Sequence, residues 1–321
     1  MSDSRILVTG ATGQIGSELV PELREIYGTD NVIVGVHKRP PSEDLKEGPT
    51  DELDVTKKKS VEDSVRKYNI DTIYHMAAIL SAKGEENPLL AWDVNMNGTY
   101  NVLEIAREYE MKQVFCPSSI AVFGPETPRE NTPQETVLHP RTMYGVTKVA
   151  GELLCDYYFK RFGLDVRGMR YPGIISNKTL PGGGTTDYAV EIFYEAIKNK
   201  EYTCFLKPDS TLPMMYMPDC IKATIDLMQA PIENLKHHSD FNLAAFSFSP
   251  KDLASEIKKH IPEFKISYEP DERQKIADSW PKTIDDTAAQ EEWGWEPRYD
   301  LQSMVKDMLR VLKEKHKQGK F

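Results

Sequence analysis

The chain has 321 residues, 40% of them hydrophobic, and a formal net charge of −10. This composition can supply the core of one large α/β unit or of two lobes. The negative charge argues against nucleic acid or an anionic membrane surface as the main partner. No apolar run approaches the roughly 18 residues that a membrane-spanning helix needs.

The cysteines and histidines give no sign of a metal site or a disulfide framework. The seven histidines include no H-E-x-x-H motif, and the four cysteines, which form no C-x-x-C pair, are Cys116, Cys155, Cys204 and Cys220. This cysteine usage indicates a reducing compartment. The first apolar run begins at Ile6, which leaves no room for a targeting segment, so we expect a cytoplasmic protein. From the histidine and cysteine patterns we also expect no bound metal ion.

Short apolar runs alternate with amphipathic helical patterns through the first half of the chain. The runs cover residues 6–8, 32–36, 72–78, 113–117 and 165–169, and the helical patterns cover 15–23, 61–65, 94–105 and 144–162. Continuous apolar strands separated by helices predict an α/β fold, a doubly wound parallel sheet of Rossmann type. We expect a dinucleotide-binding domain over 1–172, joined by returning segments near 214–247. An interleaved, smaller substrate lobe is expected over 173–321, where prolines become frequent and the alternation ends.

A glycine-rich turn follows the first predicted strand. The segment VTGATGQIG places Gly10, Gly13 and Gly16 between that strand and the first helix. Glycine at these positions permits a tight turn, a close approach of a pyrophosphate and close helix–strand packing. A structural turn is the alternative, but a strand before and a helix after favour a nucleotide site, to which we also assign Gln14 and Ile15.

The end of the second predicted strand lacks the acidic residue that commonly binds the ribose of NAD. In VIVGVHKRP, Val36 and His37 stand at this point, and Lys38 and Arg39 follow. Basic residues here can pair with the 2′-phosphate of NADP, although an exposed basic turn explains them equally well. We assign His37 and Lys38 to the cofactor site, and expect Asp54 to meet the adenine amino group.

The residues expected to do the chemistry lie on one helix and one strand. YGVTK places Tyr144 and Lys148 four residues apart, on the same face of a helix. A phenol is a poor base at neutral pH, but an adjacent ammonium favours the phenolate, so the pair makes a usable general base. The segment CPSSIAVFG, about 25 residues earlier, offers the Ser119 hydroxyl to orient a substrate oxygen, and Asn95 adds a fixed polar group.

In this order and spacing, the motifs resemble the extended short-chain dehydrogenase/reductase family across nearly the whole chain. The resemblance implies a Rossmann fold, a bound nicotinamide cofactor and hydride transfer at a carbon that bears a hydroxyl. It implies that Tyr144 is the base, that Lys148 binds the ribose and that Ser119 binds the substrate oxygen. The other residues that we assign to the cofactor site are Val55, Ala77, Asn95 and Tyr171.

A second resemblance bears on the substrate. Nucleotide-sugar members of that family carry an R-D-Y-I-H-V-x-D segment, whereas this chain has LPMMYMPD, with Leu212 in place of the arginine and Asp219 retained. The segments GGGTTDYAVEIFYEA, MRYPGIIS and ADSWPKTIDDTAAQEEWGW resemble short-chain L-threonine 3-dehydrogenases. This resemblance implies oxidation of L-threonine to 2-amino-3-ketobutyrate with a nicotinamide cofactor and without a metal.

The glycine loop at residues 182–186 is then expected to hold the substrate carboxylate. Backbone amides at a helix N-terminus are free donors, and the Thr186 hydroxyl can add a further hydrogen bond; a purely structural loop is the alternative. Trp280 is expected to wall the pocket, although it could equally be plain packing. The full substrate set is Ser81, Ser119, Tyr144, Gly184, Thr185, Thr186 and Trp280.

The cofactor and the function each have an alternative, and the resemblance adds an expectation about assembly. The resemblance supports NAD while the residues at 36–39 do not, so NAD is favoured and NADP is not excluded. A nucleotide-sugar epimerase or dehydratase, and a non-enzymatic dinucleotide sensor, are the alternative functions. The resemblance also implies a homodimer formed through a four-helix interface, for which the candidates are the helices at 89–109 and 144–162.

Overall fold

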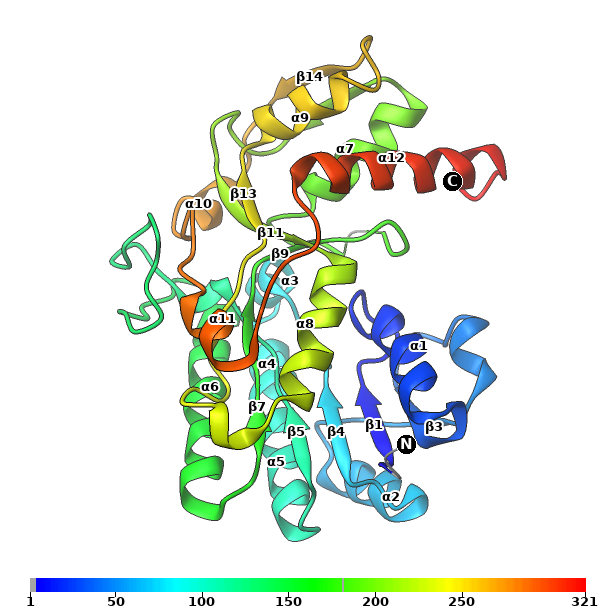
Figure 1. Cartoon of the computed structure of the whole chain (residues 1–321), viewed down its shortest axis with the longest axis vertical. Helices are drawn as coiled ribbons and strands as arrows, with labels where there is room; N and C mark the ends of the chain where they lie inside the picture. Colours follow the sequence, from blue (N-terminus) through cyan, green and yellow to red (C-terminus); the bar gives the residue numbers. More distant parts are fainter. Residues whose placement is uncertain (1–3, 181) are drawn as a thin grey trace.

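The computed structural model describes residues 4–180 and 182–321; the first three residues, part of the stretch on which the expectation about targeting depends, lie outside it. A six-stranded parallel sheet in the order β3-β2-β1-β4-β5-β7 forms the centre of the molecule (Figure 1). Its strands are β1 (Ile6–Thr9), β2 (Val32–Val36), β3 (Thr50–Glu52), β4 (Thr72–His75), β5 (Gln113–Phe115) and β7 (Val166–Arg167).

Helices cover both faces of this sheet because alternate strand residues point to opposite sides. Ile6 and Val8 pack into a core with α1 (Gly16–Tyr27) and α8 (Met217–Gln229). Leu7 faces the other core, with α2 (Lys58–Tyr68), α5 (Gly98–Glu108) and α6 (Met143–Phe162). The predicted α/β class and the parallel sheet are confirmed.

The strands are shorter than the apolar runs that predicted them. β4 ends at His75 rather than at residue 78, and β5 ends two residues before Pro117. The last predicted strand is divided at Gly168, where a Cβ would lie 2.1 Å from the carbonyl oxygen of Cys116. The chain then resumes as β8 (Met169–Tyr171) in a second, three-stranded sheet.

Smaller sheets and the remaining helices lie mostly beyond the carboxyl ends of the central strands (Figure 1). One sheet contains β6 (Ser118–Ser119), β8 and β12 (Phe241–Asn242). The others contain β9 (Gly173–Ile175), β11 (Leu212–Tyr216) and β13 (Phe246–Phe248), and β10 (Glu201–Cys204) with β14 (Lys265–Tyr268). The remaining helices are α3 (Ser81–Glu86), α4 (Pro88–Trp92), α7 (Tyr188–Lys198), α9 (Pro250–Lys258), α10 (Arg273–Ala277), α11 (Thr287–Trp293) and α12 (Leu301–Lys317), with a π-helical turn (Asp93–Asn97) and 3₁₀ turns at Thr29–Asn31, Asp44–Glu47, Ile120–Val122 and Ile232–Asn234.

The segment at 214–247 contributes to both parts of the molecule. Its helix α8 packs in the same core as α1, and its strand β12 pairs with β8. The boundary between the two lobes at 172/173 stays a prediction. No helix in the described part of the chain is long and apolar enough to span a bilayer.

Candidate active site

The glycine turn after β1 is built for close backbone packing. Gly10 has a φ of +61°, and a Cβ there would lie 2.6 Å from the amide nitrogen of Ala77. A Cβ on Gly16 would lie 2.6 Å from the Gly10 carbonyl oxygen, to which Gly13 donates its amide at 2.9 Å. Side chains are therefore excluded at Gly10 and Gly16. The Gly16 amide at the start of α1, which has no acceptor among the described residues, can bind a phosphate, whereas the Ser17 and Glu18 amides already donate to the Gly13 and Ile15 carbonyls. The cradle fits a dinucleotide.

The same loop touches the substrate half of the chain. The Gln14 side chain donates to the carbonyl oxygen of Ile174 at 3.4 Å, and Ile15 borders the core next to α1. The Ser17 and Thr179 hydroxyls are 3.3 Å apart. The segment that leads into the loop at 182–186 thus packs directly on the turn expected to hold the cofactor.

A carboxylate lies next to the end of β2, although β2 itself supplies none. The Asp54 Oδ1 accepts hydrogen bonds from the amide and hydroxyl of Thr56, and its Oδ2 is 3.8 Å from His37 Nε2 and 3.3 Å from Lys57 Nζ. Burial raises the pKa of Asp54, but the Thr56 hydrogen bonds and Lys57 outweigh it, so the pKa lies below its ordinary value. Lys38 is exposed. Sequence reasoning missed that Asp54 and His37 meet.

The predicted base and its lysine lie at the start of α6. The Thr142 hydroxyl caps this helix by accepting the Gly145 amide at 3.0 Å, which fixes where the helix begins. Tyr144 is 9% exposed, and the Lys148 ammonium is 5.6 Å from the centroid of its ring. Lys148 also donates to the Pro117 carbonyl oxygen at 2.7 Å. The structure therefore brings the two residues of the YGVTK motif together.

The turn that carries Ser119 packs against this helix. A Cβ on Gly145 would lie 2.3 Å from the Ala121 carbonyl oxygen, so only glycine allows the contact. The Ser119 oxygen accepts the Ala121 amide at 3.2 Å, which leaves its own proton available for donation. Tyr144, Lys148 and Ser119 are thus carried by two elements in direct contact.

Asn95 holds the loop after β4 to α6. It lies in the π-helical turn between α4 and α5, an irregularity often found at functional sites. Its side chain exchanges hydrogen bonds with the amide and carbonyl of Ile79 and donates to the Thr147 hydroxyl at 3.1 Å. Its direct contact with a cofactor stays a prediction.

A small cavity of about 30 Å³ borders Lys148, with His75 and Ala77 in its lining. Burial and the charge of Lys148 lower the pKa of His75 to about 3, so this imidazole is neutral at physiological pH. Its Nδ1 is 2.9 Å from the Thr9 hydroxyl. The volume is that of about one or two water molecules.

Two further residues assigned to the cofactor have their polar groups engaged within the protein. The Tyr171 hydroxyl bonds to Thr224 inside the core, and burial raises the pKa of Tyr171 well above its ordinary value. Any contribution of Tyr171 to cofactor binding comes through its backbone. The Val55 carbonyl oxygen accepts the Asn101 side chain at 2.9 Å.

The glycine loop differs from its predicted arrangement. The Gly183 and Gly184 amides donate to Asp187 Oδ2, at 2.8 and 2.6 Å. Burial raises the pKa of Asp187, although these hydrogen bonds oppose the shift. The carboxylate bound by these two amides is therefore the protein's own. The Thr185 hydroxyl is buried and has no hydrogen-bond partner among the described residues, and the Thr186 side chain packs over Gly173.

Helix α3 lies between this loop and Tyr144, the predicted base. A Cβ on Gly84 would lie 3.8 Å from the Cβ of Tyr144, and a Cβ on Gly183 would lie 3.8 Å from Lys83 Cε. Ser81, the first residue of α3, is buried. Sequence reasoning did not single out Lys83, an exposed cation beside the glycine loop.

Trp280 is 5% exposed and belongs to the same hydrophobic core as Tyr144. Its carbonyl oxygen accepts the Arg129 Nε at 3.1 Å. Packing accounts for this burial, and a role as the wall of the substrate pocket stays a prediction.

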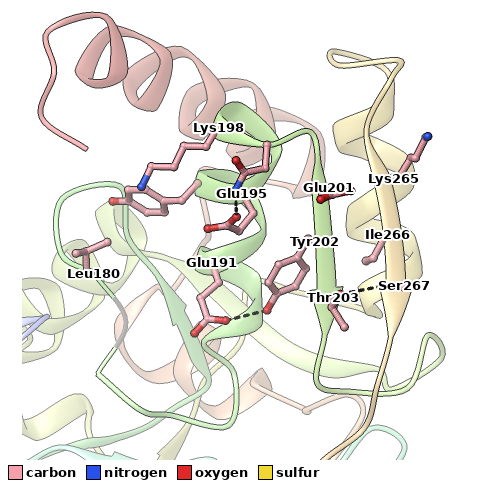
Figure 2. Close-up of a pocket in the computed structure, with 12 residues that line it drawn as sticks. Leu180, Glu191, Glu195, Lys198, Glu201, Tyr202, Thr203, Lys265, Ile266 and Ser267 are labelled. Carbon is pink, nitrogen blue, oxygen red and sulfur yellow. Dashed lines mark hydrogen bonds between the residues drawn. The ribbon is translucent and has the colours of Figure 1, made fainter.

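A pocket of about 730 Å³ lies elsewhere, between α7 and the strands β10 and β14. Figure 2 shows Glu191 pointing toward Tyr202, with Glu195 on the same helix and Lys265 across the opening. Its described lining contains none of the residues assigned to the cofactor or the reaction. The location of the reaction at α6 stays a prediction. No cluster of three or more potential metal ligands occurs within the described ranges.

The parallel sheet, the glycine cradle and the Tyr144–Lys148–Ser119 group define the class: a nicotinamide-dependent oxidoreductase of the extended short-chain type. The chain belongs to the NAD dependent epimerase/dehydratase family, which matches residues 6–244. An uncharacterised epimerase/dehydratase of Staphylococcus haemolyticus is 52% identical, over 97% of this chain and 98% of its own length.

Solved structures resemble the chain equally closely. L-threonine dehydrogenase from Clostridium difficile is 51% identical, with a TM-score of 0.94, over 98% of this chain and 99% of that one. A monomeric L-threonine 3-dehydrogenase from a metagenome is 50% identical, with a TM-score of 0.93, over 96% and 99%. The predicted resemblance to short-chain L-threonine 3-dehydrogenases is confirmed.

Proposed function

We propose that this protein oxidises L-threonine to 2-amino-3-ketobutyrate with NAD, as a metal-independent dehydrogenase of threonine catabolism. The observation that carries the proposal is the contact between the start of α6, with Tyr144 and Lys148, and the turn with Ser119. The similar L-threonine dehydrogenases, which match almost the full length of the chain, support the choice of alcohol.

Oxidation of the C3 carbinol removes a proton from the hydroxyl and a hydride from the carbon. The chain's own residues act on the hydroxyl and its proton. The Ser119 hydroxyl donates to the substrate oxygen and fixes its position. Tyr144, as the phenolate, takes the hydroxyl proton, and the nearby Lys148 ammonium stabilises that negative charge. NAD, when bound, supplies the acceptor for the hydride.

We place the amino-acid end of the substrate between α3 and the glycine loop. The Thr185 hydroxyl, buried and unpaired within the described chain, and the Thr186 hydroxyl are the candidate donors there. Ser81 lies at the start of α3, and the positive charge of Lys83 suits a carboxylate. This assignment replaces the Gly183 and Gly184 amides, because Asp187 already occupies them.

Conversion of a nucleotide sugar is the alternative that the family name raises. The segment where such enzymes carry an arginine forms β11, and Leu212, Met214 and Met215 in it are at most 1% exposed. Asp219, the retained acid, accepts the backbone amides of Arg298 and Tyr299 and so serves the fold. A buried apolar strand is poorly suited to neutralising a diphosphate.

The deciding experiment is an assay of the purified protein with L-threonine and NAD, followed at the NADH absorbance, with and without a chelator. We expect NADH to form at the same rate in both. Loss of activity on chelation, restored by zinc, would refute the metal-free mechanism. Conversion of a UDP-sugar without reaction of threonine would favour the alternative.

We further propose that the protein is cytoplasmic and works as a homodimer. Its four cysteines are free and buried, which suits a reducing compartment. Leu89 on α4 and Leu153 on α6 are 84% and 66% exposed, and Tyr157 is half-exposed. Tyr100 on α5 and Phe162 on α6 are also exposed, and Arg107 of α5 lies over the Phe162 ring at 5.2 Å. A second copy could cover these exposed side chains.

A further inference from the structure

The helix of Tyr144 and Lys148 carries a carboxylate in line with these two residues. Tyr144, Lys148 and Glu152 recur at intervals of four, which places all three along one stripe of α6. The Glu152 carboxylate is 7% exposed, and nothing in the proposed reaction uses it. Burying a charge is costly unless the charge is paired, so the partner of Glu152 and its role beside the reaction centre have to be identified.

Its partner is Arg170 on β8, held in a bidentate pair. Glu152 Oε1 accepts Arg170 Nε at 2.9 Å, and Oε2 accepts Nη2 at 2.9 Å. The remaining Nη1 donates to the Gln134 carbonyl oxygen and the Asn242 side chain, at 3.1 and 3.0 Å. Such a fully hydrogen-bonded pair fixes the relative orientation of the two side chains as well as their separation.

The pair also reaches the strand that carries the predicted catalytic serine. Ser118, next to Ser119 on β6, donates its hydroxyl to Glu152 Oε1. β6 lies beside β8, with Ser118 opposite Arg170. One turn earlier on α6, Lys148 bonds to the carbonyl of Pro117, the residue before Ser118. The helix and the strand are therefore joined at two successive points.

We propose that Glu152 is a positioning residue: held by Arg170, it sets the spacing between the helix of Tyr144 and Lys148 and the strand of Ser119. This inference rests on the proposed function for its kinetic effect. Stability alone is a weak reason for such a pair, because buried ion pairs often contribute no more than well-packed apolar residues of the same volume. Geometry offers a stronger reason, since a misplacement of about 1 Å can cost about 10²-fold in rate.

The chain supplies a matched control. Asp165 and Arg167 form a second bidentate pair, in which Arg167 is buried and Asp165 partly buried, with both hydrogen bonds at 2.8 Å. Its other side-chain hydrogen bonds go to Gln113, Leu227 and Ala230, rather than to α6 or β6. Asp165→Asn therefore breaks a pair of the same kind outside the catalytic contact.

The test compares Glu152→Gln, Ser118→Ala and Asp165→Asn by steady-state kinetics, thermal melting and NAD titration. We expect Glu152→Gln to lower kcat by about 10–100-fold, with KM for threonine within about threefold, because the displaced groups act at the reacting oxygen, while the site proposed for the amino-acid end of the substrate is not displaced. Ser118→Ala, which leaves the ion pair intact, should lower kcat by about 3–10-fold. Asp165→Asn should lose stability like Glu152→Gln but keep kcat within about twofold.

Parent-level kcat in both Glu152→Gln and Ser118→Ala would overturn the inference, as would an equal loss of kcat in Asp165→Asn. If Glu152→Gln does not fold, Ser118→Ala decides alone. If the parent does not oxidise threonine, the proposed function fails, and NAD affinity becomes the readout. Glu152→Gln must then weaken NAD binding, through the shifted Lys148, by about threefold or more while Asp165→Asn does not.

Discussion

Replacing Asp187 by alanine tests what the glycine loop does. In the structure this carboxylate accepts the amides of Gly183 and Gly184 just before α7 begins. Without it the loop loses its internal anchor, and Thr185 and Thr186 lose their fixed position. The expected consequence is weaker binding of threonine, with little change for NAD.

The magnitude follows from the two hydrogen bonds. Each bond to a charged acceptor is worth about 1.5–3 kcal/mol. Gly183 is exposed, so water can replace Asp187 at that amide, whereas the half-buried Gly184 amide loses most of its bond. A net loosening of about 1.5–3 kcal/mol corresponds to roughly a 10–100-fold fall in kcat/KM, at about 1.4 kcal/mol per factor of ten.

The assay varies L-threonine at saturating NAD, alongside a thermal melt. Asp252→Ala is the control, because Asp252 likewise accepts a backbone amide that precedes a helix: it accepts the amide and hydroxyl of Ser249 at the start of α9. We expect that control to lose stability while KM stays unchanged. A lower KM in Asp187→Ala would refute the reasoning, since it would mean that the freed amides bind the substrate carboxylate, as the sequence alone had predicted.

Three further outcomes are expected. Tyr144→Phe should lower kcat by about 10²–10⁴-fold with nearly unchanged NAD affinity, while Lys148→Met should damage both; parent-like turnover of the first would remove the phenol from the mechanism. The parent should prefer NAD by a narrow margin, and Val36→Asp should sharpen that preference when kcat/KM is compared for NAD and NADP; rejection of NADP by more than about 10³-fold in the parent would contradict this. Light scattering at micromolar concentration should give a dimer mass, and Leu153→Glu should give a monomer; a monomeric parent would exclude the proposed interface.

The parts of the fold and site that could be predicted depend on short stretches of chain. The glycine turn and the YGVTK helix have geometries fixed by local spacing, so VTGATGQIG and the four-residue interval from Tyr144 were sufficient. The strand ends were less predictable, because an apolar run does not reveal where a proline or a close backbone approach, as at Gly168, interrupts the ladder.

Contacts made only by the tertiary fold were not predictable. Asp187 was included in the quoted glycine segment, yet nothing in the sequence distinguishes an acid that binds the neighbouring amides from one that faces solvent. Glu152 meets Ser118 and Arg170, which lie 34 and 18 residues away. Such pairings depend on how β6, β8 and α6 come together, and a single sequence carries no direct record of that.

The choice between NAD and NADP also depends on a contact that only the tertiary fold makes. From the sequence, the lack of an acid at Val36 and His37 conflicted with NAD, the cofactor of the family. In the structure the Asp54 carboxylate, which lies outside β2, is 3.8 Å from His37 Nε2. The pKa of Asp54 is lowered, so this carboxylate is ionised at neutral pH. A negative charge there disfavours an additional phosphate, while the Lys57 ammonium, 3.3 Å from Asp54 Oδ2, partly offsets it. A carboxylate partly neutralised by a neighbouring lysine discriminates less than a free one, so we expect the preference for NAD over NADP to be narrow.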